Sequence, residues 1–403
     1  MKILMLTPYL PYPPASGGQI RTLNLLKYLS KNNEITLISL YKNNKEKKYS
    51  KYLTNYCLRV YACKRAEKPW QFKIISKAIF TPKPLLIVRN FSREAQALLE
   101  DLLKKQTFDV IHAETFYIMP HIPKTNIPIL LVEQTIEYQV YQHFVNSLAL
   151  LIRPFFYLDV LKLKYWEKYY WKKATVVSTV SETDKQIILH DESSIDPVIV
   201  PNGAGDEMFV EKLVEKQIDN PILLFQGNFS WLQNSEAASY LIEKIQPLIK
   251  RALPQAKIVI AGQQTKKIKI KKNSFIKLIE FAPDNIDPVK KIYQQATLFI
   301  APIFGPGGTR LKILAAMASG LPVISTTTGI EGLEVKNNQH VLVADTPEEF
   351  VQRIKFILNN KKIYDEIRTN AYELAKQKYS WSSITKTLEV IYKNIAQKNE
   401  NRN

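Results

Sequence analysis

Residues 305–334 read GPGGTRLKILAAMASGLPVISTTTGIEGLE, and this segment is the basis of the fold that we predict. It follows an apolar run, Leu298–Ala301, which has the length of a buried strand. A helix is expected to begin near Gly308-Thr309. The glycines before it let the backbone approach a ligand closely, and the free N–H groups of the helix favour an anion at that end. The segment therefore predicts a strand, an anion-binding turn and a helix.

Two basic residues, Arg310 and Lys312, fall in the first turn of this expected helix. Cations are normally unfavourable at a helix N-terminus, and a bound diphosphate would make them favourable there. The alternative is a glycine loop needed only for strand-to-helix packing, with the basic residues in solvent. The spacing matches neither GxxxxGK[ST] nor GxGxxG, so neither a Walker loop nor a dinucleotide fingerprint is predicted.

The rest of the chain alternates short apolar runs with helix-length segments. Such runs predict buried strands in βα units, and hence parallel sheets. A turn cluster, Pro201-Asn202-Gly203, predicts the domain boundary. We expect an N-terminal domain over residues 1–201, a second over 202–378 and a final helix over 379–403 that crosses back to the first. The expected strands are residues 2–7, 35–41, 110–112, 129–133, 175–180, 198–200, 222–225, 257–261, 298–301 and 322–325, with helices over 20–29 and 235–251.

The composition is that of a globular protein. A chain of 403 residues favours two domains, and 46% hydrophobic with 23% charged residues excludes a disordered chain. The two cysteines, Cys57 and Cys63, have no metal-type spacing, so we expect neither a disulfide framework nor a metal site. The apolar N-terminus stops at Thr7-Pro8, too short for a signal peptide, and no apolar stretch of about 20 residues predicts a membrane span. The expected location is the cytoplasm.

The net charge is 56 − 37 = +19. It indicates a nucleic acid, an anionic membrane or phosphate-bearing substrates as partners, or else a drift in composition. No helix-turn-helix, zinc-finger or RNP-type signature is present, so nucleic acid is not expected. Residues 150–174, rich in aromatics and lysines, either lie peripherally on the inner face of an anionic membrane or form a long helix packed on the core.

Polar residues follow several of the expected strands. Glu114 and Glu137 come after strands of the first domain, where a carboxylate can orient an acceptor hydroxyl or act as base. Asn228 and Trp231 come after a strand of the second domain, at the usual ligand-binding edge of a doubly wound sheet. The alternative for each of these residues is a structural role, in helix capping, hydrogen bonding at the core edge or packing. His112 and Glu133 lie at the same strand ends.

The segment quoted first resembles the donor-site signature of the family 4 retaining glycosyltransferases. In one branch of that family it reads GGTRLKILEAMAxGxPVVST, followed by GxEGL. The resemblance spans nearly the whole chain and implies a GT-B fold, an α/β architecture of two Rossmann-like, doubly wound domains that face a central cleft. Further blocks that resemble the family, in the same order, are TPYLPYPPASGGQIRTLNLLKYL, VEQTIEYQVY, VSETD, PNGAGDEMF, FQGNFSWLQN and YSW.

The resemblance also implies the reaction. A sugar would pass from a nucleoside-diphosphate-sugar to an acceptor hydroxyl with retention of configuration, without metal or other cofactor. The acceptor would be a glycan or a lipid-linked glycan, in polysaccharide or glycoconjugate biosynthesis. Arg310 and Lys312 would stabilise the departing diphosphate. The implied donor-binding positions are Gly17, Gly18, Asn228, Trp231, Gly307, Gly308, Thr309, Ala315 and Glu331.

One position departs from the family pattern. Ala315 stands where the family has the glutamate that holds the donor ribose. Loss of a charge-assisted hydrogen bond costs about 1.5–3 kcal/mol, or about ten- to a hundred-fold in affinity. Either a neighbour such as Glu331 or Glu334 replaces the glutamate, or donor affinity is weak, or the chain is a non-catalytic sugar-nucleotide sensor or scaffold.

Overall fold

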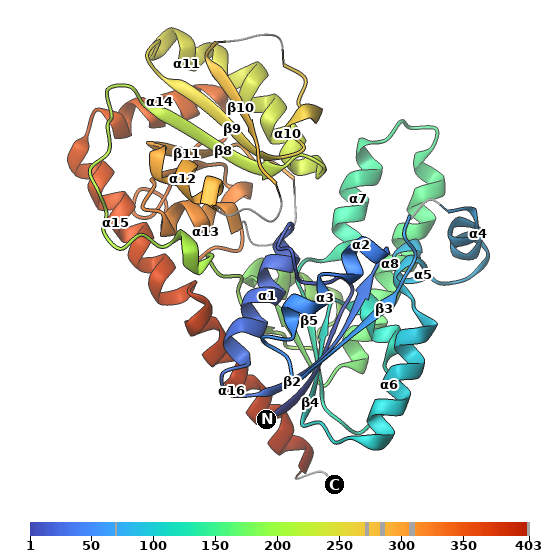
Figure 1. The fold of residues 1–403 in the computed structure, drawn as a ribbon. Coiled ribbons are helices and arrows are strands. Elements are labelled where there is room, and N and C mark those ends of the chain that lie inside the picture. The colour runs from blue at the N-terminus through green and yellow to red at the C-terminus, as the bar shows by residue number, and fades with distance from the viewer. Residues whose placement is uncertain (69–70, 271–273, 283–286, 306–310, 401–403) are drawn as a thin grey trace. The chain divides into compact units, whose positions relative to one another are not determined.

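The computed structural model describes residues 1–68, 71–270, 274–282, 287–305 and 311–400 (Figure 1). The chain divides into two compact units. Unit 1 comprises Met1–Pro201 and the chain from Thr385 onward, and unit 2 comprises Asn202–Ile384. Each unit contains one parallel α/β sheet, so we describe each by itself.

The described residues of unit 1 form a seven-stranded parallel sheet in the order β3-β2-β1-β4-β5-β6-β7. The apolar runs predicted as strands up to residue 200 all belong to it. The edge strand β3 was not predicted, because only one of its six side chains, that of Cys63, is buried. The strands are β1 (Lys2–Thr7), β2 (Glu34–Tyr41), β3 (Arg59–Lys64), β4 (Val110–Glu114), β5 (Ile129–Glu133), β6 (Val176–Thr179) and β7 (Val198–Ile199).

Helices flank this sheet (Figure 1). The first begins at Gly17, earlier than residue 20, because the Ser16 side chain caps it by accepting a hydrogen bond from the Gln19 N–H. No helix among the described residues is long and apolar enough to cross a membrane. The helical segments are α1 (Gly17–Leu29), α2 (Asn44–Lys47), α3 (Ser50–Leu53), α4 (Phe72–Phe80), α5 (Leu85–Asn90), α6 (Arg93–Lys105), η1 (Phe116–His121), α7 (Glu137–Ser147), α8 (Arg153–Lys173), α9 (Glu182–Asp191) and the part of α16 (Trp381–Glu400) from Thr385 onward.

Unit 2 contains, in its described part, a six-stranded parallel sheet in the order β10-β9-β8-β11-β12-β13. The helix expected over 235–251 is present as α10 and α11, joined by a π-helical turn, η3. The strands are β8 (Ile222–Asn228), β9 (Lys257–Gln263), β10 (Ile276–Glu280), β11 (Leu298–Ala301), β12 (Val323–Ser325) and β13 (Leu342–Val343). The helical segments are η2 (Asp206–Met208), α10 (Leu232–Tyr240), η3 (Leu241–Ile245), α11 (Gln246–Ala252), η4 (Thr265–Lys267), α12 (Asp287–Gln295), α13 (Leu311–Ala318), η5 (Thr328–Ile330), α14 (Pro347–Leu358) and α15 (Lys361–Lys378).

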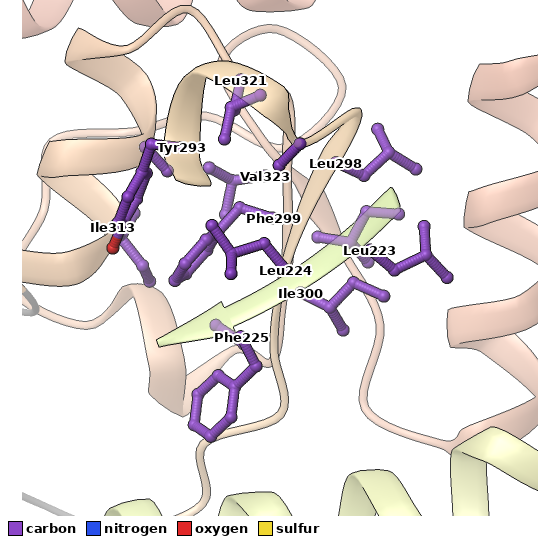
Figure 2. Close-up of a cluster of buried hydrophobic side chains, with 14 of the residues drawn as sticks. Leu223, Leu224, Phe225, Tyr293, Leu298, Phe299, Ile300, Ile313, Leu321 and Val323 are labelled. Atoms are coloured by element: carbon purple, nitrogen blue, oxygen red, sulfur yellow. The ribbon is translucent and has the colours of Figure 1, made fainter. Parts of the chain in front are cut away.

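Part of the core of unit 2 lies between its sheet and α13. Figure 2 shows Leu224 of β8, Phe299 of β11 and Ile313 of α13 among the buried side chains of this cluster. Each of the three is fully buried, and burial of such a side chain contributes about 1.5–3 kcal/mol. The residues of the LKILAAMA segment thus form a helix that is held to the sheet by its apolar face.

Several strands continue beyond their predicted ends. β4 runs to Glu114 and β8 to Asn228, so these polar residues are the last residues of strands rather than the first residues of loops. The prediction stopped short because a charged or amide side chain normally ends a buried strand. Here hydrogen bonds to neighbouring strand ends and loops compensate for the burial.

The ends of β8 and β9 approach so closely that a side chain cannot fit between them. A Cβ at Gly262 would lie 1.9 Å from the Gly227 carbonyl oxygen, and Gly262 has a φ of +142°. We predict that Gly262→Ala lowers the stability of unit 2 by about 3 kcal/mol or more, because it combines a backbone clash with strain. Urea unfolding monitored by circular dichroism measures this loss.

Gly205→Ala is the matched control in the same unit. Gly205 has a φ of −61°, and the nearest atom to an added Cβ is the end of the Glu207 side chain, which can rotate away. Its unfolding midpoint should change little. Equal midpoints for both variants would contradict the close approach of the two strands.

Candidate functional site

In unit 1 the strand order changes direction between β1 and β4. Ligands of doubly wound sheets bind outside the carboxyl ends of the strands at such a point. Gly17 and Gly18 begin α1 directly after the β1 loop, and Glu114 is the last residue of β4. The structure therefore brings these three predicted site residues to the same edge of the sheet.

Gly18 is required by its surroundings. A Cβ at this position would lie 1.9 Å from the hydroxyl oxygen of Tyr9 and 2.6 Å from Oε1 of Gln134. The Tyr9 hydroxyl donates to Gln134 Oε1 at 3.3 Å. Only glycine lets the first turn of α1 lie against this hydrogen-bonded pair.

A buried charge network lies below this turn. Arg21, fully buried in α1, has its Nε 3.8 Å from Glu114 Oε1, and its NH1 donates to the carbonyls of Val200 (3.1 Å) and Pro201 (2.9 Å). His112 Nε2 lies 2.8 Å from Glu114 Oε1. The arginine thus connects α1, the end of β4 and the chain that follows β7.

Two more groups complete the network around Glu114. Gln134 Nε2 donates to Glu114 Oε2 at 2.5 Å, and His112 Nδ1 makes a short hydrogen bond with the Tyr392 hydroxyl of α16. Burial alone would raise the pKa of Glu114, but the hydrogen bond to His112 and the charge of Arg21 lower it below its usual value. Glu114 is therefore an ionised, fully buried carboxylate with both oxygens in hydrogen bonds.

Glu137, the other predicted catalytic carboxylate, is the half-buried first residue of α7. Burial raises its pKa to about 7, against the opposing charge of Arg89. Its backbone N–H donates to Glu167 Oε1 at 2.8 Å. Glu133, at the end of β5, is buried and accepts a hydrogen bond from Trp171 Nε1 at 2.8 Å. Of these carboxylates, Glu137 combines partial exposure with a pKa near neutrality.

In unit 2 the strand order changes direction between β8 and β11. Asn228, the last residue of β8, donates from Nδ2 to Gln263 Oε1 at 2.9 Å, and its Oδ1 accepts the Ser230 N–H at 3.0 Å. Trp231, three residues on, is the N-cap of α10 and is 55% exposed. Trp231 is therefore not part of the core, so a purely packing role does not explain it.

Lys312 lies in the first turn of the described part of α13. Its Nζ makes a short hydrogen bond with Asn234 Oδ1 and lies 5.3 Å from the centre of the Phe225 ring. Asn234 in turn donates to the Asn228 carbonyl at 2.8 Å. The amine of Lys312 is thus held beside the end of β8. Gly307, Gly308, Thr309 and Arg310, also predicted for this site, lie outside the described residues.

Three residues, Ala315, Glu331 and Glu334, bear on the missing ribose glutamate. Ala315 is half-buried in α13, and Glu331 is the exposed C-cap of η5. Glu334 forms an ion pair with Lys378. Of the two suggested replacements for the ribose glutamate, Glu331 is the one without such a pair among the described residues. No group of three or more His, Cys, Asp or Glu in the described part of the chain could hold a metal ion.

Sequence reasoning missed Arg21, the centre of the unit 1 network. A signal was present, because Arg21, Leu25 and Leu29 share one face of α1 at a spacing of four residues, and all three are buried. An arginine in an apolar stripe needs a buried partner. Its partner could not be read from the sequence, since Glu114 lies 93 residues further along the chain.

Comparison with known proteins relates unit 2 to a family of glycosyltransferases. Residues 220–360, inside unit 2, match the family described as "Glycosyl transferases group 1". The chain is similar to an uncharacterised 44.6 kDa protein in the cps region of Klebsiella pneumoniae, with 24% identity over 94% of this chain and 96% of that protein. Residues 220–360 are thus similar to a glycosyltransferase domain.

Solved structures establish the fold of the whole chain. Sucrose-phosphate synthase from Thermosynechococcus elongatus superposes with a TM-score of 0.70 at 13% identity, over 98% of this chain and 99% of that one. The Anabaena protein HepE in complex with UDP-glucose superposes with a TM-score of 0.65 at 13% identity, over 98% and 100%. These likenesses confirm the predicted fold class, GT-B with two Rossmann-like domains.

The charge network of unit 1 can be tested by removing its carboxylate charge. We predict that Glu114→Gln destabilises the protein by about 3 kcal/mol, because it leaves Arg21 buried without a counter-ion. The folded-state pKa of Glu114 is lowered, so its contribution is complete above the usual glutamate range and is lost as the pH falls. Urea unfolding at pH 7 checks the magnitude.

Glu34→Gln, at an exposed position in β2 of the same unit, is the control and should unfold at the wild-type midpoint. If Glu114→Gln also unfolds there, Glu114 does not stabilise Arg21.

Proposed function

We propose that this chain is a retaining, metal-independent glycosyltransferase that uses a nucleoside-diphosphate-sugar donor in polysaccharide or glycoconjugate biosynthesis. The observation that carries the proposal is the position of Lys312, whose amine is held beside the end of β8 inside the segment that matches the glycosyltransferase family. The structural neighbour HepE was crystallised with UDP-glucose, which supports the same class of donor.

The donor would bind at the carboxyl ends of β8, β11 and β12. Lys312 would contact the diphosphate, together with Arg310 and the backbone of Gly307, Gly308 and Thr309. A cation there stabilises the charge that develops on the departing diphosphate, without a metal ion. Asn228 and Trp231 would line the donor pocket from the β8 side, and Glu331 would contact the sugar or take over the ribose contact.

The acceptor would bind to unit 1. Glu137 would orient the acceptor hydroxyl or accept its proton, because it is half-buried and has a pKa near 7. Glu114, fully buried, would act as a positioning residue: it holds Gln134, and through it Tyr9, against Gly17-Gly18. The comparisons do not favour the alternative of a non-catalytic sensor or scaffold, whose basis is Ala315.

Donor binding is the direct test. We predict that calorimetry with UDP, GDP and their sugars detects micromolar, Mg²⁺-independent binding of one nucleotide class. Lys312→Gln should weaken this binding at least tenfold by removing a charge-assisted contact. Ala315→Glu should strengthen it about ten- to a hundred-fold by restoring an acceptor for the ribose hydroxyls.

Lys250→Gln, at an exposed position on α11 in the same unit, is the control for charge. Absence of binding to every nucleotide and nucleotide sugar, by the wild type and by Ala315→Glu, would rule out the donor class. Tight binding by Ala315→Glu alone would show that the wild type no longer binds the donor, which leaves the scaffold and excludes the sugar-nucleotide sensor.

We also propose that unit 1 binds an anionic membrane. Phe72, Phe80 and Leu151 are 87%, 85% and 89% exposed, which is unusual for side chains of this size. Lys162 Nζ of α8 donates to the carbonyls of Ala78 and Thr81, both at 2.8 Å, so the end of α4 lies against α8. The apolar surface that results, named here the α4–α8 surface, comprises Phe72, Ile79, Phe80, Leu150, Leu151, Phe155, Leu158, Leu161 and Tyr165.

Lysines accompany the α4–α8 surface. Lys73 and Lys77 are exposed on α4, and Lys172 and Lys173 are exposed at the end of α8. Exposed apolar side chains with adjacent lysines are typical of segments that lie in the interface of an anionic membrane. Leu163 and Trp171 of α8 are buried, so this segment is also, in part, the predicted long helix packed on the core.

Vesicle flotation tests this partner. The wild type should float with vesicles that contain phosphatidylglycerol and less with purely zwitterionic ones. The triple variant Phe72→Ser, Leu151→Ser, Phe155→Ser should lose at least tenfold in vesicle affinity, because it removes apolar contacts at the interface. Leu58→Ser, at another exposed site of unit 1, should float as the wild type does. A wild type that stays in the soluble fraction with both vesicles would contradict the proposal.

A further inference from the structure

Two basic residues lie next to each other just beyond the ends of neighbouring strands in unit 1. Lys42 directly follows β2, and Arg65 directly follows β3. The two strands are parallel neighbours in which Tyr41 lies opposite Lys64, and the Arg65 N–H donates to the Tyr41 carbonyl at 2.9 Å. This pairing continues past the strand ends and brings Lys42 and Arg65 to the carboxyl edge of the sheet, where doubly wound folds bind ligands.

A third cation, Arg89 in the last turn of α5, shares this place. Burial lowers the pKa of Arg65, and the charge of Arg89 lowers it further. Burial lowers the pKa of Lys42 as well, and the charges of Arg65 and Arg89 lower it further, while the carboxylate of Glu46 opposes the shift of both Lys42 and Arg65. The three cations are therefore close enough to repel one another, in a partly desolvated location that favours the arrival of an anion.

The arginines have unused hydrogen-bonding capacity. The Nε atoms of Arg65 and Arg89 are shielded from solvent and have no hydrogen-bond partner among the described residues. The one carboxylate ion-paired with this group in the described chain is Glu46, 3.8 Å from Lys42 and itself 36% exposed. Buried donors without partners lower the stability of the fold, and a ligand oxygen that accepts from them would remove that cost.

The same cations border the proposed acceptor residues. The charge of Arg89 acts on Glu137, and also on Tyr117, which follows β4, and on Tyr141 of α7. Tyr117 in turn responds to Tyr9, which lies against Gly18. Because β2 pairs with β1, and β1 with β4, in one parallel sheet, Lys42 and Arg65 lie at the same carboxyl edge as the ends of β1 and β4.

We infer that Lys42, Arg65 and Arg89 form a subsite for an oxyanion, a phosphate or a carboxylate carried by the acceptor. Guanidinium groups present parallel N–H donors that match two oxygens of such a group, and the lysine adds a third charge. That the oxyanion belongs to the acceptor rests on the proposed function. That an oxyanion binds here is independent of it.

Calorimetry at constant ionic strength tests the subsite with two probes, glucose 6-phosphate and glucuronate. The wild type should bind at least one of them saturably, and the probe that binds identifies the anion as phosphate or carboxylate. Arg65→Gln and Arg89→Gln should each weaken this binding at least tenfold. Arg93→Gln, at an exposed position of α6 in the same unit, should bind as the wild type does.

The variant Lys312→Gln distinguishes the donor site from the subsite, because it should weaken nucleotide binding and leave probe binding unchanged. Urea midpoints establish that each variant is folded, and Lys42→Gln, at a half-exposed position, replaces any arginine variant that is not. The inference is overturned if neither probe saturates, if the arginine variants bind like the wild type, or if Lys312→Gln abolishes probe binding. Probe binding that persists in a protein that binds no nucleotide would retain the subsite and refute the donor.

Discussion

The buried guanidinium of Arg21 is the constraint on which the rest of unit 1 depends. Removing a cation from water costs several kcal/mol, and the fold must provide compensation from fixed positions. Glu114 provides the opposite charge, and the carbonyls of Val200 and Pro201 provide hydrogen bonds. Because these partners come from β4 and from the chain after β7, Arg21 fixes α1 relative to both.

This compensation extends outward from Glu114 to the surface of the site. Glu114 needs hydrogen bonds of its own, which come from His112 and Gln134. His112 is in turn hydrogen-bonded to Tyr392 of the last helix, and Gln134 to the Tyr9 hydroxyl. The hydroxyl occupies the space of a side chain at Gly18, so the glycine follows from the same chain of contacts. A buried charge in α1 thereby determines which residue can occupy the second position of that helix.

The sequence predicts the centre of each sheet better than its edges or its site. Central strands such as β1 and β11 are continuous apolar runs because both of their faces are covered. The edge strands β3 and β10 have exposed or half-exposed residues, so no apolar run predicted them. The extension of β4 to Glu114 was missed because the compensation of that carboxylate depends on tertiary contacts. The cations at 42, 65 and 89 stand in no recognisable motif, since three separate elements bring them together.

The two sets of buried cations in unit 1 differ in how they are compensated, and this difference bears on function. Arg21 lies beside a carboxylate and donates to two carbonyls, all within the protein. Arg65 and Arg89 are placed near each other and near Lys42, and the one carboxylate ion-paired with this group among the described residues is the partly exposed Glu46. A cation that serves only stability is expected to have its partner inside the fold, as Arg21 does. Repulsion retained at the ligand-binding edge of a sheet instead lowers stability, and an anionic ligand that relieves it would gain affinity from that relief.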